Sequence, residues 1–543
     1  MSRIKEVLNK YSYKVEYRDD WKLFNALLRE DRDILDFFDE LGNKFRLIHV
    51  FGVDRGYKNI ELNYFIEYRG DSILNIVLKR YLSKENLEAI SIANKVKHAL
   101  WPERECMELL GVKFNNHPDP RHLFLPYDWP EESKDFTKID TSNSKISLIS
   151  IGPYHPALIE GIFLRVKLSS DKIVEDVDIK PGFSHRGIMR LAEERNYWQN
   201  IVLIERICGI CSMAHTTCYV NVVERLFNVN PPLRAKVIRV LVSELNRIHS
   251  HLLALGLLAD IAGFTNLFLD TWKIREHAMN SIEIICGNRA SEGINTIGGV
   301  RRDLSEAKIK GVKNELEKII RGLPQLYDRF NGIGIRDKLE DVGKISYASA
   351  VKWGVVGPPA RGAGVKRDVR KDFPYDAYNE FPWNLVSENS GDVFSRVLVW
   401  FGELKESLDL CNQCLDFLEK NDGEIVNESF LPVNGEAYMR VEAPRGDLFY
   451  YIVGGKPISQ INMGGVKPIT LVIKTPTYTT IPVLNEILIG SRVEEIPIIL
   501  GSLDPCIACL DRAIIIDKSG RKYSYNYISM SEFSRKCSRL GDE

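Results

Sequence analysis

Hydrophobic and polar positions follow two different periods in the first 130 residues. From Trp21 to Leu41 apolar residues recur at helical spacing, which predicts an amphipathic helix. From Ile60 to Tyr68 apolar and mostly polar residues alternate, which predicts a strand, and 73–78 is predicted as a second strand paired with it. We therefore expect residues 1–130 to form a separate α/β domain.

The rest of the chain combines short strand-like runs with long helical patterns. Strands are predicted over 163–168, 173–179, 448–453 and 471–474, and long helices over 233–258, from Arg301-Arg302-Asp303 onward, and over 401–418. Asp303 suits the N-terminal turn of its helix. Glu244, Arg247 and His251 lie three and four residues apart, which favours a buried ion pair in a helical bundle. The predicted fold class is α+β: an N-terminal α/β domain, then a mainly α-helical domain with small β-sheets.

A polar segment separates the two parts. Residues from Pro126 to about Ser144 include Pro130 and an Asp-Thr-Ser-Asn-Ser run, a composition typical of a linker. We place the linker at 131–145, the second domain at 146–512 and a C-terminal tail at 513–543.

Composition narrows the class of protein. The chain has 543 residues, 44% of them hydrophobic, which is ordinary for a globular protein with more than one core. The formal net charge of −1 gives no support to a nucleic-acid partner. No apolar run is long enough to span a membrane and no signal peptide is recognised, so we expect any membrane association to come through partners. Ten scattered cysteines suit a reducing cytoplasm better than a disulfide framework.

Two Cys-x-x-Cys pairs carry the candidate chemistry. Cys208-Gly-Ile-Cys211 and Cys506-Ile-Ala-Cys509 are about 300 residues apart, and together they offer four thiolates to one site. A structural zinc site usually draws its pairs from one small module, which the separation opposes. A redox dithiol needs only one pair. A soft transition-metal centre uses both, and we favour it.

The neighbours of these pairs support that choice. Arg206 and His215 flank the first pair, and Asp504 precedes the second, which continues to Asp511-Arg512. The sequence Arg-Ile-Cys-Gly-Ile-Cys followed by His, together with Asp-Pro-Cys-x-x-Cys near the C-terminus, resembles the large subunit of [NiFe]-hydrogenases. The ending in Asp-Arg resembles the membrane-associated, energy-converting group, which includes the formate hydrogenlyase large subunit and is related to complex I.

Other segments extend the resemblance over nearly the whole chain. The segment 101–121 is similar to the signature of the 30 kDa subunit of complex I, and we interpret it as a docking surface rather than a catalytic one. The passages around His155 and from Gly182 to Met189 are similar to the pattern that hydrogenase and complex I 49 kDa-type large subunits share. His155 and His185 are candidate proton carriers, the alternative being that each fixes its loop by hydrogen bonding.

The resemblance implies roles for the site residues. Cys208 and Cys506 would be terminal nickel ligands, and Cys211 and Cys509 would bridge nickel to an iron that also carries CO and cyanide. Arg445, in a Pro-Arg-Gly segment, would lie over the centre, with Asp504 beside it. Without the resemblance, we would interpret Arg445 as a surface turn residue. His215 would hydrogen-bond a cysteine sulfur.

One position departs from the family pattern. Met189 stands where we expect the glutamate that accepts protons near nickel, and methionine cannot ionise. Glu160, Glu205, Asp504 and His215 are the candidate substitutes.

The resemblance also implies partners. The chain lacks a further cysteine set with iron–sulfur spacing, so electrons would leave through a small subunit that carries a 4Fe–4S cluster. Ferredoxin-like subunits and membrane-embedded antiporter-like subunits would complete the complex on the cytoplasmic side of the membrane. The tail after Arg512 is a candidate maturation peptide for a protease, or a retained tail.

Two alternatives stay open at this point. One is a complex I-like quinone or electron-transfer subunit without a nickel–iron centre, which the four motif cysteines oppose and Met189 favours. The other is a scaffold whose cysteines bind zinc.

A third Cys-x-x-Cys, Cys411 and Cys414, lies inside a continuous helical pattern and is interpreted as a pair of core cysteines.

Overall fold

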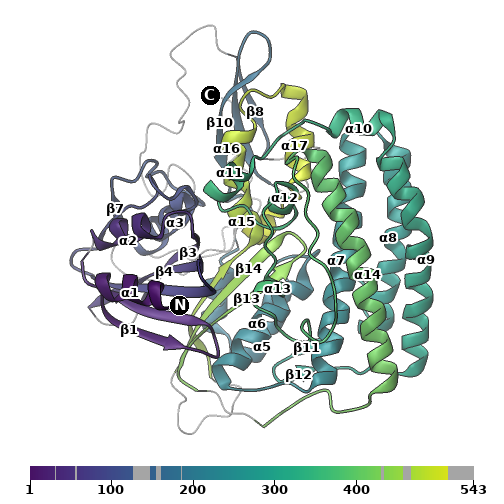
Figure 1. Cartoon of the computed structure of the whole chain (residues 1–543), viewed down its shortest axis with the longest axis horizontal. Helices are drawn as coiled ribbons and strands as arrows, with labels where there is room; N and C mark the ends of the chain where they lie inside the picture. Colours follow the sequence, from purple (N-terminus) through teal and green to yellow (C-terminus); the bar gives the residue numbers. More distant parts are fainter. Residues whose placement is uncertain are drawn as a thin grey trace, which may run out of the picture.

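The computed structural model describes residues 1–30, 32–54, 58–125, 147–153, 161–184, 186–429, 433–455 and 466–510. An N-terminal sheet with three helices packs against a larger, mainly helical part. The long helices of this second part lie on the right of Figure 1. In the described part of the chain, no helix is long and apolar enough to cross a lipid bilayer. The α+β fold class predicted from the sequence is confirmed.

The N-terminal part is built on a mixed five-stranded sheet with the strand order β1-β2-β5-β4-β3. Only the β2–β5 pairing is parallel. The elements are α1 (Ser2–Tyr11), β1 (Ser12–Arg18), β2 (Leu23–Leu28), α2 (Asp33–Leu41), β3 (Phe45–Asp54), β4 (Asn59–Arg69), β5 (Ile73–Ser83), β6 (Glu88–Ile90), η1 (Lys97–Ala99), α3 (Leu100–Leu110) and β7 (Lys113–Asn115). Helices α1, α2 and α3 cover one face of the sheet and form one core with it.

The helix predicted over 21–41 is partly wrong. Residues Leu23–Leu28 form strand β2, and only Asp33–Leu41 is helical. The apolar run fits either period over such a short length. The strand is favoured because Leu23–Leu28 pairs with β1 on one side and with β5 on the other. Its backbone amides and carbonyls therefore form hydrogen bonds on both edges.

The predicted strand pair is confirmed as β4 and β5, with Ile66 opposite Ile76. Its polar alternate positions do not face solvent, however. Glu61, Asn63 and Glu67 of β4 are all buried, because this face of the sheet lies against the second part of the chain. Glu67 accepts a hydrogen bond from Arg440 Nη2 at 2.5 Å across that contact.

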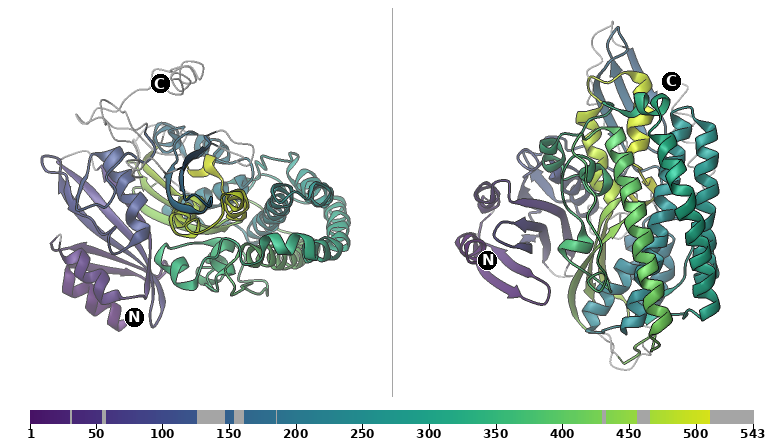
Figure 2. Two further views of the ribbon diagram at one scale, coloured as in Figure 1. Left: turned by 90° about the horizontal axis from the view of Figure 1, so that it is seen from above. Right: turned by 45° about the vertical axis from the view of Figure 1, so that its right-hand side comes forward.

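The second part consists of a long-helix layer, shorter helices and two antiparallel three-stranded sheets. The sheets have the orders β10-β9-β8 and β13-β14-β15. The strands are β8 (Ser147–Ile151), β9 (Phe163–Leu168), β10 (Val174–Lys180), β11 (Asn295–Thr296), β12 (Gly299–Val300), β13 (Gly435–Ala443), β14 (Gly446–Gly454) and β15 (Pro468–Lys474). Figure 2 shows the long helices side by side, away from the N-terminal sheet.

Helices make up most of the second part. They are α4 (Ile188–Glu194), α5 (Tyr197–Glu205), α6 (Ser212–Phe227), α7 (Leu233–Ile261), α8 (Thr265–Cys286), α9 (Glu306–Phe330), α10 (Ile333–Leu339), α11 (Tyr347–Lys352), α12 (Gly357–Gly362), α13 (Val369–Asp372), α14 (Val393–Lys420), α15 (Pro476–Thr480), η3 (Ile481–Val483), α16 (Leu484–Ile487), η4 (Val493–Glu495), α17 (Ile496–Ser502) and α18 (Ile507–Leu510). The long helices predicted over 233–258 and 401–418 are therefore present as α7 and α14.

The predicted opening of a helix at Asp303 is wrong by one turn. Helix α9 begins at Glu306, and the Ser305 side chain caps it by accepting from the Lys308 amide. Asp303 instead accepts a hydrogen bond from Arg234 Nε at 2.9 Å, which ties the approach to α9 to the start of α7.

The predicted buried charges of α7 are confirmed. Glu244 accepts hydrogen bonds from Arg370 Nη1 at 3.0 Å, from Arg247 Nε at 3.2 Å and from Ser407 Oγ at 2.6 Å. His251 Nε2 lies 2.9 Å from a carboxylate oxygen of Glu403 on α14. Buried charges of this kind are tolerated only when paired and hydrogen-bonded, so they fix the relative position of α7, α13 and α14.

The segment 101–121 does dock, but within its own chain. Arg121 forms two hydrogen bonds with Asp178 of β10, at 2.9 and 2.8 Å. Beyond it, Lys180 Nζ donates to the carbonyls of Leu123 at 2.7 Å and Leu125 at 2.6 Å, while the Glu108 carboxylate accepts from the Leu125 amide at 2.8 Å. A buried cation therefore bonds the carbonyls, and a buried anion the amides, of the same stretch of backbone.

Replacing Lys180 tests this clamp. Lys180→Met keeps the length of the side chain but leaves buried carbonyls without a donor, so the free energy of unfolding should fall by about 2–3 kcal/mol. Urea unfolding followed by tryptophan fluorescence measures the change. The matched control is Lys167→Met on the neighbouring strand β9, which pairs with the exposed Glu175 at 3.3 Å and should change stability by less than about 0.5 kcal/mol. Equal losses in both variants would contradict the role of the clamp.

Candidate metal centre

The two cysteine pairs lie where helices begin. Cys208 and Cys211 occupy the connection between α5 and α6, and Cys211 is the residue that immediately precedes α6. Cys506 immediately precedes the short helix α18, which contains Cys509. All four side chains are buried, with 2–4% of their surface exposed.

The fold brings the two pairs together, as the sequence predicted. The Sγ atoms of Cys208 and Cys506 are 3.3 Å apart, those of Cys211 and Cys509 are 3.7 Å apart, and those of Cys506 and Cys509 are 3.0 Å apart. Metal–sulfur bonds of about 2.3 Å in tetrahedral geometry place sulfur atoms about 3.7 Å from one another. The sulfur atoms lie at this separation or somewhat closer, and thiolates are soft ligands, so the cluster suits a thiophilic metal.

Three of the thiols, those of Cys208, Cys506 and Cys509, have pKa values shifted in different directions. Contacts with the neighbouring thiols, Cys211 first, and the nearby Arg445 guanidinium lower the pKa of Cys208 well below its ordinary value. The contact with Cys208 raises the pKa of Cys506, and burial raises that of Cys509. A bound cation would stabilise all four thiolates together, because it supplies the positive charge that the buried cluster needs.

His215 touches the cluster from α6. It lies one helical turn after Cys211, and its Nε2 atom is 3.4 Å from Cys509 Sγ. Its Nδ1 atom is 2.7 Å from the hydroxyl of Tyr450 on β14. The predicted contact of His215 with a cysteine sulfur is present, and the Tyr450 hydroxyl sets the orientation of the ring.

Arg445 and Asp504 lie together beside the cysteines. Arg445 occupies the two-residue turn between β13 and β14, and it is only 5% exposed. Its Nε donates to the Asp504 carbonyl at 2.6 Å, its Nη2 to Asp504 Oδ1 at 2.7 Å, and its Nη1 to Ser250 Oγ at 3.2 Å. Asp504 has a φ of 49°, a strained conformation for a residue with a side chain, and Arg445 stabilises it through two bonds.

Two glycines let the Arg445 turn approach the helical part closely. Gly357, at the start of α12, has a φ of 68°, and a Cβ atom there would lie 2.1 Å from the Arg445 carbonyl oxygen. Gly446 has a φ of 122°, and its Cβ would lie 2.6 Å from the Gly357 amide nitrogen. A side chain at either position would push the turn, and Arg445 with it, away from the cysteines.

Arg186 is a site residue for which the sequence predicted no role, although it lies in the segment 182–189. Its guanidinium donates to the carbonyls of Arg206 at 2.9 Å and Ile207 at 2.7 Å beside the first pair, and to that of Ala508 at 2.8 Å within the second. One side chain therefore ties both cysteine segments. Its place next to His185 in that segment was the only signal in the sequence that could have indicated this role.

The remaining predicted residues divide into three groups. His155, Glu160, His185 and the tail from residue 511 onward lie outside the described residues. Met189 is buried, and its sulfur accepts from the Ile473 amide at 3.3 Å, so it serves packing rather than proton transfer. Cys411 and Cys414 are buried in α14, and burial raises the pKa of both thiols well above the ordinary value, as expected of core cysteines.

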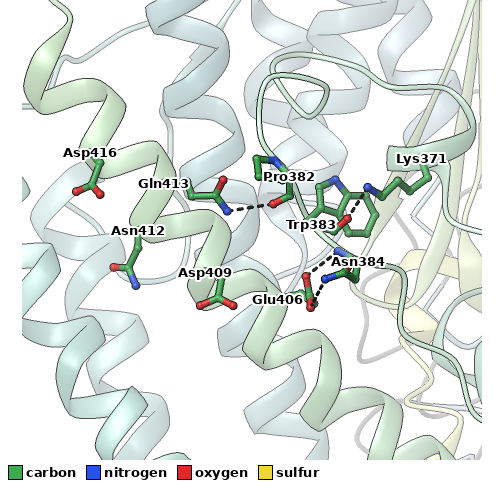
Figure 3. Close-up of a pocket in the computed structure, with 9 residues that line it drawn as sticks. All are labelled: Lys371, Pro382, Trp383, Asn384, Glu406, Asp409, Asn412, Gln413 and Asp416. Carbon is green, nitrogen blue, oxygen red and sulfur yellow. Dashed lines mark hydrogen bonds between the residues drawn. The ribbon is translucent and has the colours of Figure 1, made fainter.

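A separate surface hollow of about 610 Å³ is not part of this centre. Figure 3 shows it between α14 and the loop from Pro382 to Asn384, where Gln413 donates to the Pro382 carbonyl at 3.1 Å. The side chains that line the hollow include neither cysteine nor histidine, and they offer no soft ligand.

Comparison with known proteins agrees with this geometry. Residues 186–260, which contain the first cysteine pair, match the nickel-dependent hydrogenase family. Residues 260–429 and 420–512 match the 49 kDa subunit of respiratory-chain NADH dehydrogenase, and residues 29–141 match its 30 kDa subunit.

Individual relatives cover most of the chain. Hydrogenase-4 component G of Escherichia coli is 32% identical over 508 residues, which is 87% of this chain and 85% of that protein. Formate hydrogenlyase subunit 5 of Escherichia coli is 31% identical over 83% of this chain and 82% of its own length. The membrane-bound hydrogenase subunit alpha of Pyrococcus furiosus is 36% identical over 69% of this chain and 89% of its own length. This chain therefore belongs to the large subunits of membrane-bound, energy-converting [NiFe]-hydrogenases, an oxidoreductase family, and it joins a 30 kDa-like part and a 49 kDa-like part in one polypeptide.

Proposed function

We propose that this chain is the catalytic large subunit of a membrane-associated, multi-subunit [NiFe]-hydrogenase that interconverts H2 with protons and electrons. The observation that carries the proposal is the set of four buried cysteine sulfurs, 3.0–3.7 Å apart along the cluster, with Arg445 and Asp504 beside them. Four thiolates suit nickel and low-spin iron.

Each cysteine has a distinct role in this proposal. Cys208 and Cys506 would be the terminal ligands of nickel, and Cys211 and Cys509 would hold both nickel and an iron that also carries CO and cyanide. The bound centre supplies the polarisation that splits H2. The cross-pair contacts match this grouping, since Cys208 Sγ lies 3.3 Å from Cys506 Sγ and Cys211 Sγ lies 3.7 Å from Cys509 Sγ.

The other residues of the chain prepare the site. Arg445 is permanently charged, and its bonds to Asp504 and Ser250 hold the guanidinium in one orientation. His215 Nε2 lies 3.4 Å from Cys509 Sγ, where a hydrogen bond would tune the electron density on that sulfur. His155 is a further candidate for proton transfer on the strength of its motif alone.

Electrons must leave through partners. Among the described residues, the cysteines outside the two pairs are Cys106, Cys218, Cys286, Cys411 and Cys414, and none of them belongs to a group of three or more side chains that could hold a metal, so they offer no iron–sulfur site. We propose a small subunit with a 4Fe–4S cluster, ferredoxin-like subunits, and membrane-embedded antiporter-like subunits that hold the chain at the cytoplasmic side of the membrane. A 30 kDa-like domain over 1–130, a linker over 131–145 and a large-subunit domain over 146–512 fit this arrangement. The tail over 513–543 is the candidate substrate of a maturation protease.

The competing function is that of a complex I-like subunit without nickel, which the match of 260–512 to the 49 kDa subunit favours. Purification with partner subunits under anaerobic conditions distinguishes the two. A hydrogenase should contain about one nickel per chain, show infrared bands of CO and cyanide, and reduce a viologen dye with H2. Absence of nickel and of these bands from the mature complex would contradict the proposal, and zinc in their place would favour a scaffold.

The assignment of ligands predicts a selective loss of metal. Cys506→Ala removes one terminal thiolate, so nickel content and H2-dependent dye reduction should both fall below about a tenth of wild type. The matched control is Cys414→Ala, which changes a buried cysteine of the third Cys-x-x-Cys and should keep full nickel content. Metal analysis of the two purified variants decides, and equal nickel content in both would refute the assignment.

The role of Arg445 predicts a loss of rate with the metal retained. Arg445→Lys keeps the charge but cannot bond the Asp504 carbonyl and carboxylate in the same fork, so the H2 oxidation rate should fall about 100-fold. Nickel content should stay near wild type. The control is Arg492→Lys, which changes an arginine with 69% of its side chain exposed that pairs with the exposed Glu494 at 3.8 Å. An unchanged rate in Arg445→Lys would show that the fork is dispensable.

A further inference from the structure

Protons have to cross the protein between the buried cysteines and solvent if the proposed function is correct, and this inference rests on that function. Splitting one H2 releases two protons and two electrons, and the electrons and protons leave by different groups. The cysteines are at most 4% exposed, so side chains or water must carry the protons. Carboxylates are suitable carriers when they are buried and not fixed by a cation.

Two of the carboxylates near the cluster are fixed by arginines. Asp504 accepts from Arg445 at 2.7 Å, and Glu205 accepts from Arg206 Nη1 at 2.6 Å. Two hydrogen bonds from Arg445 therefore fix Asp504 in place deep in the site. The pairing of Glu205 is different, because Arg206 has 56% of its side chain exposed and shares its charge with solvent.

Glu292 differs from both. It lies on the connection between α8 and β11, it is only 2% exposed, and its described partners are neutral. Its Oε2 accepts from Ser212 Oγ at 2.6 Å, and its Oε1 accepts from Asn246 Nδ2 at 2.8 Å. Ser212 directly follows Cys211, so the serine hydroxyl connects the carboxyl group to the start of α6 beside the cysteines.

The surroundings of Glu292 let it change protonation state near neutral pH. Burial raises its pKa to about 7, and the hydrogen bond from Ser212 opposes the rise. The titratable groups that act on it are Glu205 from α5 and Cys208, and it acts in turn on Cys286 of α8. Asn246 of α7 contributes an uncharged amide.

Glu205 connects this position to the surface. Its Oε1 accepts from the amide of Gly293, the residue after Glu292, at 2.6 Å. Its Oε2 accepts from Nη1 of the half-exposed Arg206 at 2.6 Å. The printed bonds therefore run from Ser212, the neighbour of Cys211, to Glu292, and from Gly293, the neighbour of Glu292, to Glu205, which pairs with the half-exposed Arg206.

We propose that Glu292 carries protons between the cysteine cluster and Glu205, and thereby between the reacting centre and solvent. In H2 oxidation the Ser212 hydroxyl passes its own proton to the Glu292 carboxylate and takes one from the cluster side. Glu292 then releases the proton towards Glu205 and solvent. No electrons move in either step, and two such transfers balance each H2.

The test uses the holoenzyme purified with its partner subunits. Glu292→Gln keeps the size and the hydrogen-bonding capacity of the side chain but cannot ionise. We expect H2 oxidation and H2–D2O exchange to slow about 100-fold while nickel content and the infrared bands of the centre stay unchanged. The wild-type rate of H2 oxidation should rise with pH through about 7, because Glu292 must be deprotonated to accept a proton, and Glu292→Gln should lose this dependence. The control is Glu283→Gln on α8, a carboxylate with 52% of its side chain exposed, which should behave as wild type.

Each outcome decides one question. Wild-type exchange and an unchanged pH profile in Glu292→Gln, with an active wild-type enzyme, would overturn the role of Glu292 and leave the proposed function intact. A wild-type complex without nickel and without H2 turnover would overturn both. If Glu292→Gln loses its nickel, Ser212→Ala is the deciding variant: exchange slowed about tenfold with nickel retained supports the route, and wild-type exchange refutes it.

Discussion

The whole arrangement depends on holding four cysteine sulfurs in one buried cluster when the two pairs are 298 residues apart. Nothing in the local sequence can do this, so the fold has to supply two helix starts that face each other. Arg186 contributes directly, because one guanidinium bonds the carbonyls of both cysteine segments. The β13–β14 turn contributes from another side, where Gly357 and Gly446 allow Arg445 to reach Asp504.

Buried charges give the scaffold its precision. Glu244 and its arginine partners fix α7 against α13 and α14, and α7 in turn carries Asn246 and Ser250 towards the cysteines. At the other side, the polar face of β4 is buried against β13 and β14. The N-terminal part therefore packs against the sheet whose β13–β14 turn carries Arg445. Joining the two parts in one chain thus helps to position Arg445 beside the cysteines.

Much of this could be predicted from the sequence, and the exceptions have physical causes. The helices over 233–258 and 401–418 were predictable because a long periodic pattern excludes a strand. The stretch 23–28 was not, because parallel pairing with β5 depends on residues about 50 positions away. The cysteines and Arg445 were predictable from their motifs. Glu292 was not, because it belongs to no motif, and only burial beside Ser212 and Asn246 distinguishes it from other glutamates.

The most direct test of the account is X-ray absorption at the nickel edge of the anaerobically purified complex. The account predicts about four sulfur neighbours near 2.3 Å and one heavier neighbour contributed by iron, with one sulfur lost in Cys506→Ala that is loaded with nickel in excess. Nickel surrounded by nitrogen or oxygen ligands, or the same sulfur count in wild type and variant, would show that the cysteine cluster is not the metal centre.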